Sequence, residues 1–373
     1  MKIIKQDSFL LGVLLFLFSI CNLGPAPLAL TIAFVSLFLF YDRFKFNFYN
    51  YLIILLFFLL CAWALLFSYH ELYFKVYAAT FIYVILAFLV VGIITGFSKD
   101  TVINAIVFVI FIHLATIIFQ QFFYILTKHY IDLHQVVTLG KYLSRNESGF
   151  INGLGMTRPT GFYVEPSSVA AIITFFNVWY YILNKRATLK FYVIQFLTML
   201  SFSFAAIAIS LLIIAYTFFR HELIKKVNIK TLISLFVVAL IFIYFVNIFY
   251  IRLTGGVGYD SVGFRQIILN HLINRDIMDN LFGEGILIFE SAIKTNGLIL
   301  SNSNIRDSGL WVNIIFSLGI FGLIAFTIFI AFFSGGLSNF IVLSFALFSK
   351  FDYLQPIVWF SIFLLLTHKR KFN

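Results

Sequence analysis

The chain has 373 residues, of which 62% are hydrophobic and only 11% charged, and its net charge is +11. A soluble domain carries about 25% charged residues, so this composition excludes an ordinary soluble protein. Repeated apolar runs reach the roughly 20 residues that a membrane-spanning helix needs. In a membrane protein, an excess of Lys and Arg marks the loops that stay on the cytoplasmic side and binds anionic lipids. No nucleic-acid partner is therefore expected.

The apolar runs predict an all-α, polytopic membrane protein with about twelve transmembrane helices. We interpret residues 1–373 as a single integral membrane domain. The N-terminal run continues past Pro25 and Pro27 without a small-residue cleavage site, which predicts an uncleaved first span. The predicted spans are 8–23, 25–41, 51–68, 76–97, 101–126, 167–183, 191–203, 205–219, 231–250, 309–332, 337–349 and 355–367.

The run 191–219 fits either one long tilted helix or two short ones. It lies between two segments rich in Lys and Arg, NKRATLK (184–190) and RHELIKKVNIK (220–230). Because positive loops stay in the cytoplasm, we expect two crossings with a break near Ser203. The same rule predicts that both termini are cytoplasmic.

Two long external loops remain, 127–166 and 251–308, and they hold most of the external charge. The first ends in TRPTGFYVEPSSVA (157–170), where Arg158 and Glu165 precede Pro166. Proline suits the first position of a helix, so Glu165 is expected near the N-cap. A guanidinium can bind phosphate in bidentate fashion, and a carboxylate at a partly dry interface can act as a general base. The alternatives are that the two side chains pair with each other, or that Glu165 complements the helix dipole.

The second loop is glycine-rich at its start, RLTGGVGYDSVGFRQ, and contains Arg252 and Arg265. Its GGVG lacks the strand–helix frame and the Lys-Ser/Thr ending of a phosphate-binding loop. From about 262 to 280 the pattern predicts an amphipathic helix in the plane of the membrane interface. One stripe holds Gln266, Asn270 and Asn274, and another holds Ile268 and Leu272.

Charged side chains of this second loop are candidates for a lipid phosphate. Arg265, His271 and Arg275 are expected to point at headgroups or a bound phosphate, or to snorkel to anionic lipid. The loop closes with Arg306 and Asp307 at the mouth of the tenth span. These two could also form a salt bridge or a helix cap.

The histidines give weaker signals. His113 lies inside the fifth span, where a satisfied interior residue and a proton relay are the two interpretations. His129 and His134 have no companion ligands at metal-binding spacing, so no metal site is predicted.

The order of these motifs resembles the O-antigen polymerase family over roughly residues 100–330. The pattern Arg158-x-x-Gly161-x-x-x-Glu165-Pro166-Ser167 is similar to the family's loop motif. The resemblance extends to LSFSFAAIAISLLII (200–214), although Phe204 replaces an expected Arg or small polar residue, and to LFGEG (281–285) and DSGLWVNIIFSLGIFGLI (307–324).

The resemblance implies an enzyme, a glycosyltransferase of the bacterial plasma (inner) membrane. It would polymerise polyprenyl-diphosphate-linked oligosaccharides on the external face, into O-antigen or capsule, without a metal or other cofactor. Expected partners are a chain-length regulator and other polysaccharide-assembly proteins.

The resemblance also implies roles for particular residues. Arg158 and Arg265 would hold the diphosphate, with Arg306 in support. Glu165 is the preferred general base, and Asp307 or His271 is the alternative. His271, Arg252 and Tyr163 are further supporting candidates.

Three alternatives stay open. An O-antigen ligase would transfer glycan to a lipid A-core, but the ligases tend to have Asn-Pro-Asn where Glu165-Pro166-Ser167 stands here, and a histidine near Asp307-Ser308. A flippase or other transporter would place charges near the bilayer midplane and have two matched halves. The third alternative is a structural membrane scaffold.

Overall fold

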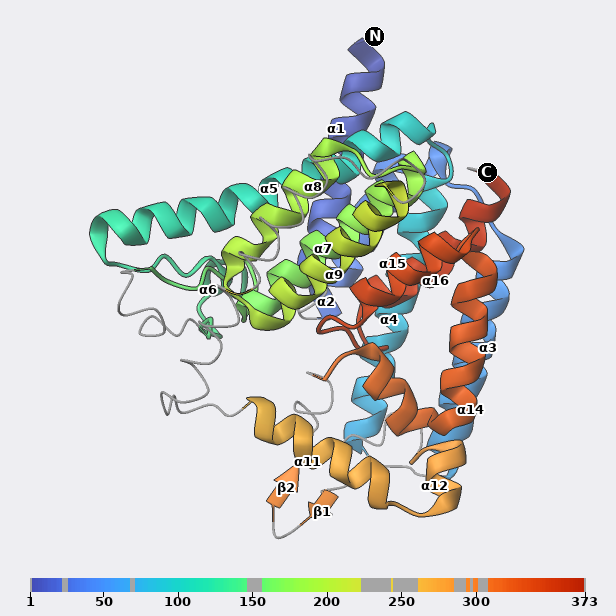
Figure 1. Ribbon diagram of the computed structural model, residues 1–373. Helices are drawn as coiled ribbons and strands as arrows, with labels where there is room; N and C mark the ends of the chain where they lie inside the picture. The colour runs from blue at the N-terminus through green and yellow to red at the C-terminus, as the bar shows by residue number, and fades with distance from the viewer. Residues whose placement is uncertain are drawn as a thin grey trace. The chain divides into compact units, whose positions relative to one another are not determined.

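The computed structural model describes residues 2–21, 26–67, 71–145, 156–222, 243, 261–284, 293–295, 298–300 and 308–371. Within them the regular secondary structure is helical, apart from an antiparallel pair of short strands, β1 (Ile293–Thr295) and β2 (Leu298–Leu300) (Figure 1). The helices are α1 Lys2–Cys21, α2 Ala26–Phe40, η1 Tyr41–Arg43, α3 Phe48–Phe67, α4 Glu71–Ile94, α5 Lys99–Thr127, α6 Leu133–Val137, α7 Pro166–Asn184, α8 Leu189–Thr198, η2 Met199–Ser201, α9 Phe204–Glu222, α11 Ser261–Asn274, α12 Ile277–Phe282, α14 Leu310–Phe333, α15 Leu337–Leu347 and α16 Pro356–Lys371.

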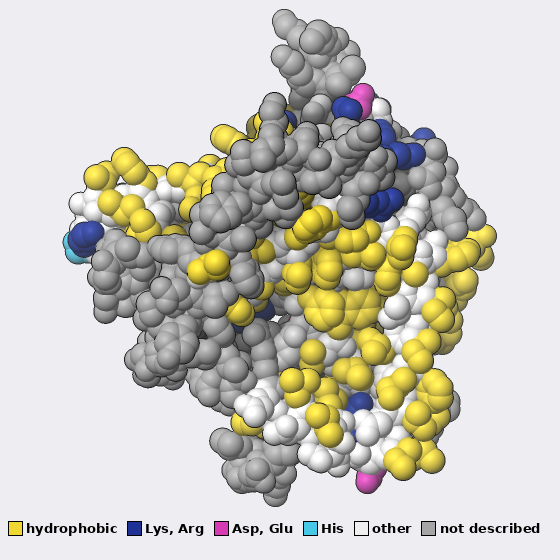
Figure 2. Space-filling view, viewed as in Figure 1, with side chains coloured by type: hydrophobic (Ala, Val, Ile, Leu, Met, Phe, Trp, Pro, Cys, Tyr) yellow, Lys and Arg dark blue, Asp and Glu magenta, His cyan; other side chains and the backbone are white. Residues whose placement is uncertain are grey.

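The predicted spans coincide with helices wherever the structure describes them, whereas the ninth, 231–250, lies outside the described residues except at position 243. Three of the described helices, α5, α7 and α14, are long and apolar enough to cross a bilayer. The other apolar helices are shorter when only the residues with described side chains are considered. The described side chains on the face seen in Figure 2 are largely hydrophobic. The protein is therefore a helical membrane protein, and the number of twelve spans stays a prediction.

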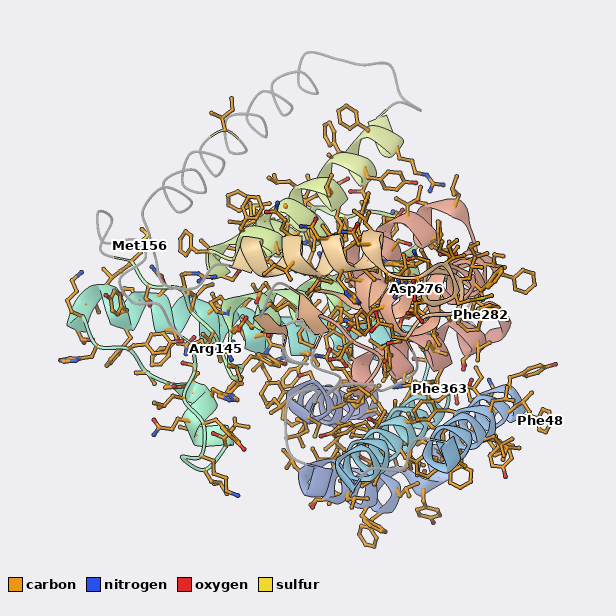
Figure 3. All side chains as sticks on the ribbon, turned by 90° about the horizontal axis from the view of Figure 1, so that it is seen from below. Phe48, Arg145, Met156, Asp276, Phe282 and Phe363 are labelled. Atoms are coloured by element: carbon orange, nitrogen blue, oxygen red, sulfur yellow. The ribbon has the colours of Figure 1, made fainter. Side chains whose placement is uncertain are left out.

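The chain divides into two compact units, which are described separately. The first comprises Met1–Ala105, Ser261–Phe340 and Lys350–Asn373; the second comprises Ile106–Asp260 and Ile341–Ser349. In the first unit α4 packs against α2, α3 and α16. Phe88 of α4 packs on Phe363 of α16, with ring centroids 6.1 Å apart. Phe363 is labelled in Figure 3. A polar contact supplements this packing: the Asn47 side chain donates a hydrogen bond to the Thr367 hydroxyl at 3.3 Å.

The second unit is built around α7, which is buried along nearly its whole length, with α8 and α9 packed on it. A buried polar network joins the three helices. Asn177 Nδ2 of α7 donates to Gln195 Oε1 of α8 at 2.9 Å. Gln195 Nε2 donates in turn to Thr174 Oγ1 at 3.2 Å and to Ser210 Oγ of α9 at 2.7 Å. Hydrogen bonds of this kind hold helices together where the hydrophobic effect between them is weak.

The predicted break in the run 191–219 is confirmed. Helix α8 ends at Thr198, a 3₁₀ turn covers Met199–Ser201, and α9 begins at Phe204. Phe202 turns the chain with a left-handed backbone, φ 50°. The ten residues of α8 rise only about 15 Å, roughly half the hydrocarbon core, so the two predicted crossings stay a prediction.

Replacing Gln195 with Leu is expected to destabilise the second unit. The substitution leaves the buried Thr174, Ser210 and Asn177 without their shared partner, which costs about 1–2 kcal/mol. Thermal unfolding of the purified protein in detergent measures the loss, with Gln6→Leu on the exposed face of α1 as the matched control. Equal unfolding midpoints for the two variants would contradict the structural role of the network.

Candidate functional site

The segment 157–165, which contains the Arg158 and Glu165 pattern, is held in place by polar side chains from three other parts of the second unit. We call this segment the motif strap. It begins directly after Met156 and leads into α7. Because its backbone is largely outside helices, its N–H and C=O groups need partners from elsewhere. Those partners explain why the strap keeps one conformation.

Gln120 of α5 clamps the centre of the motif strap. Its Oε1 accepts from the Gly161 N–H at 2.7 Å, while its Nε2 donates to the Gly161 carbonyl at 3.4 Å and to the Ile131 carbonyl at 2.9 Å. Gly161 has a left-handed backbone, φ 59°, and a Cβ added there would lie 3.0 Å from Val169 Cγ2. The turn therefore favours glycine, and a side chain there would also be in tight contact with Val169.

Two side chains preceding the strap bind the residues on either side of Gly161. The Tyr130 hydroxyl lies 2.7 Å from Thr160 Oγ1 and accepts from the Thr160 N–H at 3.1 Å. Burial raises the pKa of Tyr130 above its ordinary value of 10, so the phenol stays protonated at physiological pH. His134 Nδ1 lies 3.0 Å from the Phe162 carbonyl. Since a carbonyl only accepts, Nδ1 carries the proton.

Arg158 is buried, with 7% of its surface exposed, and its Nε donates to the Phe202 carbonyl at 3.2 Å. That carbonyl lies at the break between α8 and α9, inside the serine-containing segment 200–214. Two motifs separated by about forty residues in the sequence thus meet. A guanidinium fixed in a poorly hydrated place keeps a strong field, because little water screens it.

Glu165 is the N-cap residue of α7 and Pro166 begins the helix, as the sequence predicted. Its side chain makes no capping hydrogen bond. Glu165 Oε1 instead accepts from Arg145 Nη1 at 2.8 Å, and Oε2 accepts from Ser167 Oγ at 3.2 Å. Arg145, labelled in Figure 3, also donates its backbone N–H to the Val164 carbonyl at 2.6 Å. The ion pair observed for Glu165 is thus with Arg145.

Tyr163 is buried and its hydroxyl lies 3.5 Å from Nε2 of His113, the histidine inside α5. The two rings also pack, with centroids 5.6 Å apart. His113 is thus an interior residue in contact with the strap.

In the first unit, the helix expected over 262–280 is two helices. Helix α11 ends at Asn274 and α12 begins at Ile277, so the prediction of one continuous helix was wrong. Asn280 causes part of the break: its side chain accepts from Arg275 Nε at 2.9 Å and donates to the Arg275 carbonyl at 3.2 Å. The amphipathic pattern holds, because the predicted polar stripe is exposed while Ile268 and Leu272 pack towards Phe316 of α14.

An apolar row also remains exposed on α11 and α12, beside the polar stripe. Phe282 ends this row (Figure 3) and packs on Phe321 of α14 with ring centroids 5.3 Å apart. A helix with such a face is typical of the membrane interface. The exposed residues are Leu269, Ile273, Ile277, Met278 and Phe282.

Arg275 does not point at headgroups, which corrects the prediction. Only 2% of its side chain is exposed. It donates from Nη2 to the Ile315 carbonyl at 2.8 Å and from Nη1 to the Phe316 carbonyl at 3.2 Å. Those carbonyls lie one turn before Gly319, whose non-helical backbone (φ 65°, ψ −163°) interrupts α14. Arg275 therefore satisfies acceptors that a regular helix would satisfy by itself.

The LFGEG turn docks on the kink of α14, backbone against backbone. A side chain added at Gly283 would overlap the backbone of Ser317 and Leu318, and one added at Gly319 would overlap the backbone of Leu281. The Glu284 N–H donates to the Phe316 carbonyl at 2.9 Å. A second pair of motifs in the resemblance is thus in direct contact.

Next to this contact lies a charged cluster. His271 Nε2 of α11 is 2.6 Å from Glu284 Oε1, and Arg275 Nη1 is 3.6 Å from the same oxygen. The His271 and Glu284 side chains are 19% and 16% exposed.

The other predicted site residues are not described at the side-chain level. Arg252, Arg306 and Asp307 lie outside the described residues, and Arg265 is on α11 with its side chain undescribed. The convergence of Arg158 with Arg265 stays a prediction.

Sequence reasoning missed Gln120, Tyr130, Arg145 and Glu284. Gln120 carried a signal, because an amide inside an apolar span usually has a fixed partner. Arg145 carried none, since its partner is twenty residues away across a stretch with no periodic pattern.

Comparison with protein-family models, with curated proteins and with solved structures finds no match for this chain.

Replacing Gly161 with Ala is expected to destabilise the protein more than replacing Gly140. Both glycines have left-handed backbones, and alanine in that conformation costs about 1–2 kcal/mol at either position. Only at Gly161 does the added Cβ press on Val169, which adds roughly 1–3 kcal/mol. Thermal unfolding in detergent compares them, and a Gly140→Ala variant as unstable as Gly161→Ala would contradict the packing of the strap.

Proposed function

We propose that this protein polymerises polyprenyl-diphosphate-linked oligosaccharide repeat units at the external face of the bacterial plasma membrane. One observation carries the proposal: motifs of the polymerase resemblance that are distant in the sequence are in contact in pairs. The Arg158 strap binds the break in 200–214, and the LFGEG turn binds the kink at Gly319. Chance similarities scattered along an apolar chain have no reason to meet in this way.

The proposed reaction needs no nucleotide outside the cell. The hydroxyl oxygen of an acceptor repeat forms a bond with the anomeric carbon of the donor sugar. The bond from that carbon to the diphosphate oxygen breaks, and its electron pair leaves with the polyprenyl diphosphate. The hydroxyl proton passes to a base on the protein. Charge grows on the diphosphate, so a fixed cation in a poorly hydrated site is the main requirement.

Arg158 meets this requirement best among the described cations of the second unit. Its burial strengthens its field, and its bond to the Phe202 carbonyl fixes the plane of the guanidinium. Arg265 and Arg306 are proposed to share the diphosphate. The sequence made Glu165 the first candidate for the base, but its two oxygens already accept from Arg145 and Ser167.

The apolar surface suits the lipid part of the substrate. Most of α14 is unburied, and α11 and α12 expose the apolar row that ends at Phe282. We place the polyprenyl chains against such faces, with both termini of the protein in the cytoplasm and a chain-length regulator as a partner.

Replacing Arg158 with Ala in a strain that lacks the chromosomal gene is expected to abolish long surface glycans. Loss of one preorganised donor to developing charge lowers turnover about 10²–10³-fold. Arg158→Lys keeps the charge but loses the planar fork, so it is expected to give only short chains. The exposed Arg186→Ala is the control and should give normal chains. Glycan length on gels, normalised to protein level, is the measurement.

The phenotype of gene deletion separates the alternatives. Loss of a polymerase leaves single repeats on the surface, whereas loss of a flippase leaves none. Normal long chains from Arg158→Ala at normal protein levels would remove this residue from the site.

Replacing Glu165 with Gln tests the base. Glutamine keeps the shape and an acceptor for Arg145 but cannot take up a proton, so a catalytic base at this position predicts a loss of about 10²–10⁴-fold. Asp100→Asn, at an exposed carboxylate, is the control. Unchanged polymerisation by Glu165→Gln would assign the proton transfer to another residue.

A further inference from the structure

The cluster of His271, Glu284 and Arg275 has the arrangement of an oriented histidine base. Glu284 Oε1 lies 2.6 Å from His271 Nε2, which is a short hydrogen bond. A carboxylate only accepts, so Nε2 carries a hydrogen. In the neutral ring the lone pair is then on Nδ1. No described residue forms a hydrogen bond with Nδ1.

The carboxylate that orients the ring is itself rigidly placed. The backbone N–H of Glu284 donates to the Phe316 carbonyl, and the preceding Gly283 lies against the backbone of Ser317. Side chains held by a scaffold of this kind keep the geometry that proton transfer requires. His271 is fixed from a second direction, because its ring packs on Phe316 with centroids 6.0 Å apart.

Arg275 supplies the charge that makes the arrangement stable. Glu284 is only 16% exposed and lies against an apolar helix, where an isolated carboxylate would be costly. Arg275 Nη1, 3.6 Å from Oε1, compensates that charge, while its other donors are committed to the carbonyls of α14 and to Asn280. Arg275 and His271 therefore face the same carboxylate oxygen of Glu284.

Partial exposure leaves His271 within reach of a substrate. At 19% exposure its side chain is shielded from most water but not enclosed. A hydroxyl could therefore approach Nδ1. The amide stripe of Gln266, Asn270 and Asn274 is exposed on the same helix, and amides are common hydrogen-bonding partners of sugar hydroxyls.

We propose that His271, oriented by Glu284, takes the proton from the attacking sugar hydroxyl, and that Glu165 has a structural role with Arg145. This inference rests on the proposed function. The hydroxyl oxygen bonds to the anomeric carbon, its proton goes to Nδ1, and the electron pair of the broken carbon–oxygen bond leaves on the lipid diphosphate. His271 then returns the proton to water. Glu284 is a positioning residue that acts through His271.

The first test measures the tautomer and needs no activity. The full-length protein, labelled with ¹⁵N-histidine and held in lipid nanodiscs, is examined by NMR at alkaline pH, with the resonance assigned by His271→Gln. The expected spectrum shows a protonated Nε2 and an unprotonated Nδ1. Glu284→Ala should shift the ring towards a mixture of tautomers. A wild-type ring protonated on Nδ1, or a spectrum unaffected by Glu284→Ala, would overturn the proposal.

The second test measures chain growth in the deletion strain. His271→Gln is expected to lower polymerisation at least about 10²-fold. Glu284→Gln, which keeps an acceptor oxygen but no charge, should retain more activity than Glu284→Ala. His129→Gln, at an exposed histidine, is the matched control. Protein level and thermal unfolding are recorded for every variant.

The outcomes separate this inference from the proposed function. If deletion of the gene shortens the glycans but a folded His271→Gln variant restores long chains, the histidine base is refuted and the polymerase proposal stands. If deletion leaves long chains intact, the polymerase proposal fails and takes the proton-transfer role with it. The tautomer measurement stays valid in either case.

Discussion

In a chain this apolar, every interruption of a helix releases backbone N–H and C=O groups where little water is present to bind them, and each unpaired group costs several kcal/mol in a hydrocarbon surrounding. The described structure answers this constraint with polar side chains. Arg158 binds the carbonyl at the break before α9, Gln120 binds both polar groups of Gly161, and Arg275 binds two carbonyls at the kink of α14. The irregular backbone of both motif regions depends on these bonds.

The same constraint connects stability with chemistry. A guanidinium fixed by a carbonyl in a dry place keeps a strong field for an anion, and a carboxylate beside a buried arginine can hold an imidazole. Residues that satisfy the backbone and residues that could act on a substrate are therefore neighbours in each unit. Arg158 binds the backbone and is itself proposed to bind the diphosphate, whereas Arg275 binds the backbone and pairs with Glu284.

How much the sequence predicted follows from the range of the interactions involved. Local patterns predicted the helix start at Pro166, the break near Ser203 and the polar and apolar stripes of α11, because each depends on a few consecutive residues. The partners of Arg275 were predicted wrongly, since its acceptors lie forty residues away and arise only from the kink at Gly319. No periodicity indicates that an arginine will turn inwards to a distant carbonyl.

The contact between the LFGEG turn and α14 has a mechanical consequence. Gly283 and Gly319 approach so closely that neither backbone can slide past the other, and Arg275 links the start of α12 to the same turn of α14. Helix α12 and the part of α14 around Gly319 are therefore expected to move together. A displacement of the LFGEG turn would therefore be transmitted directly to α14, an apolar helix long enough to cross a bilayer.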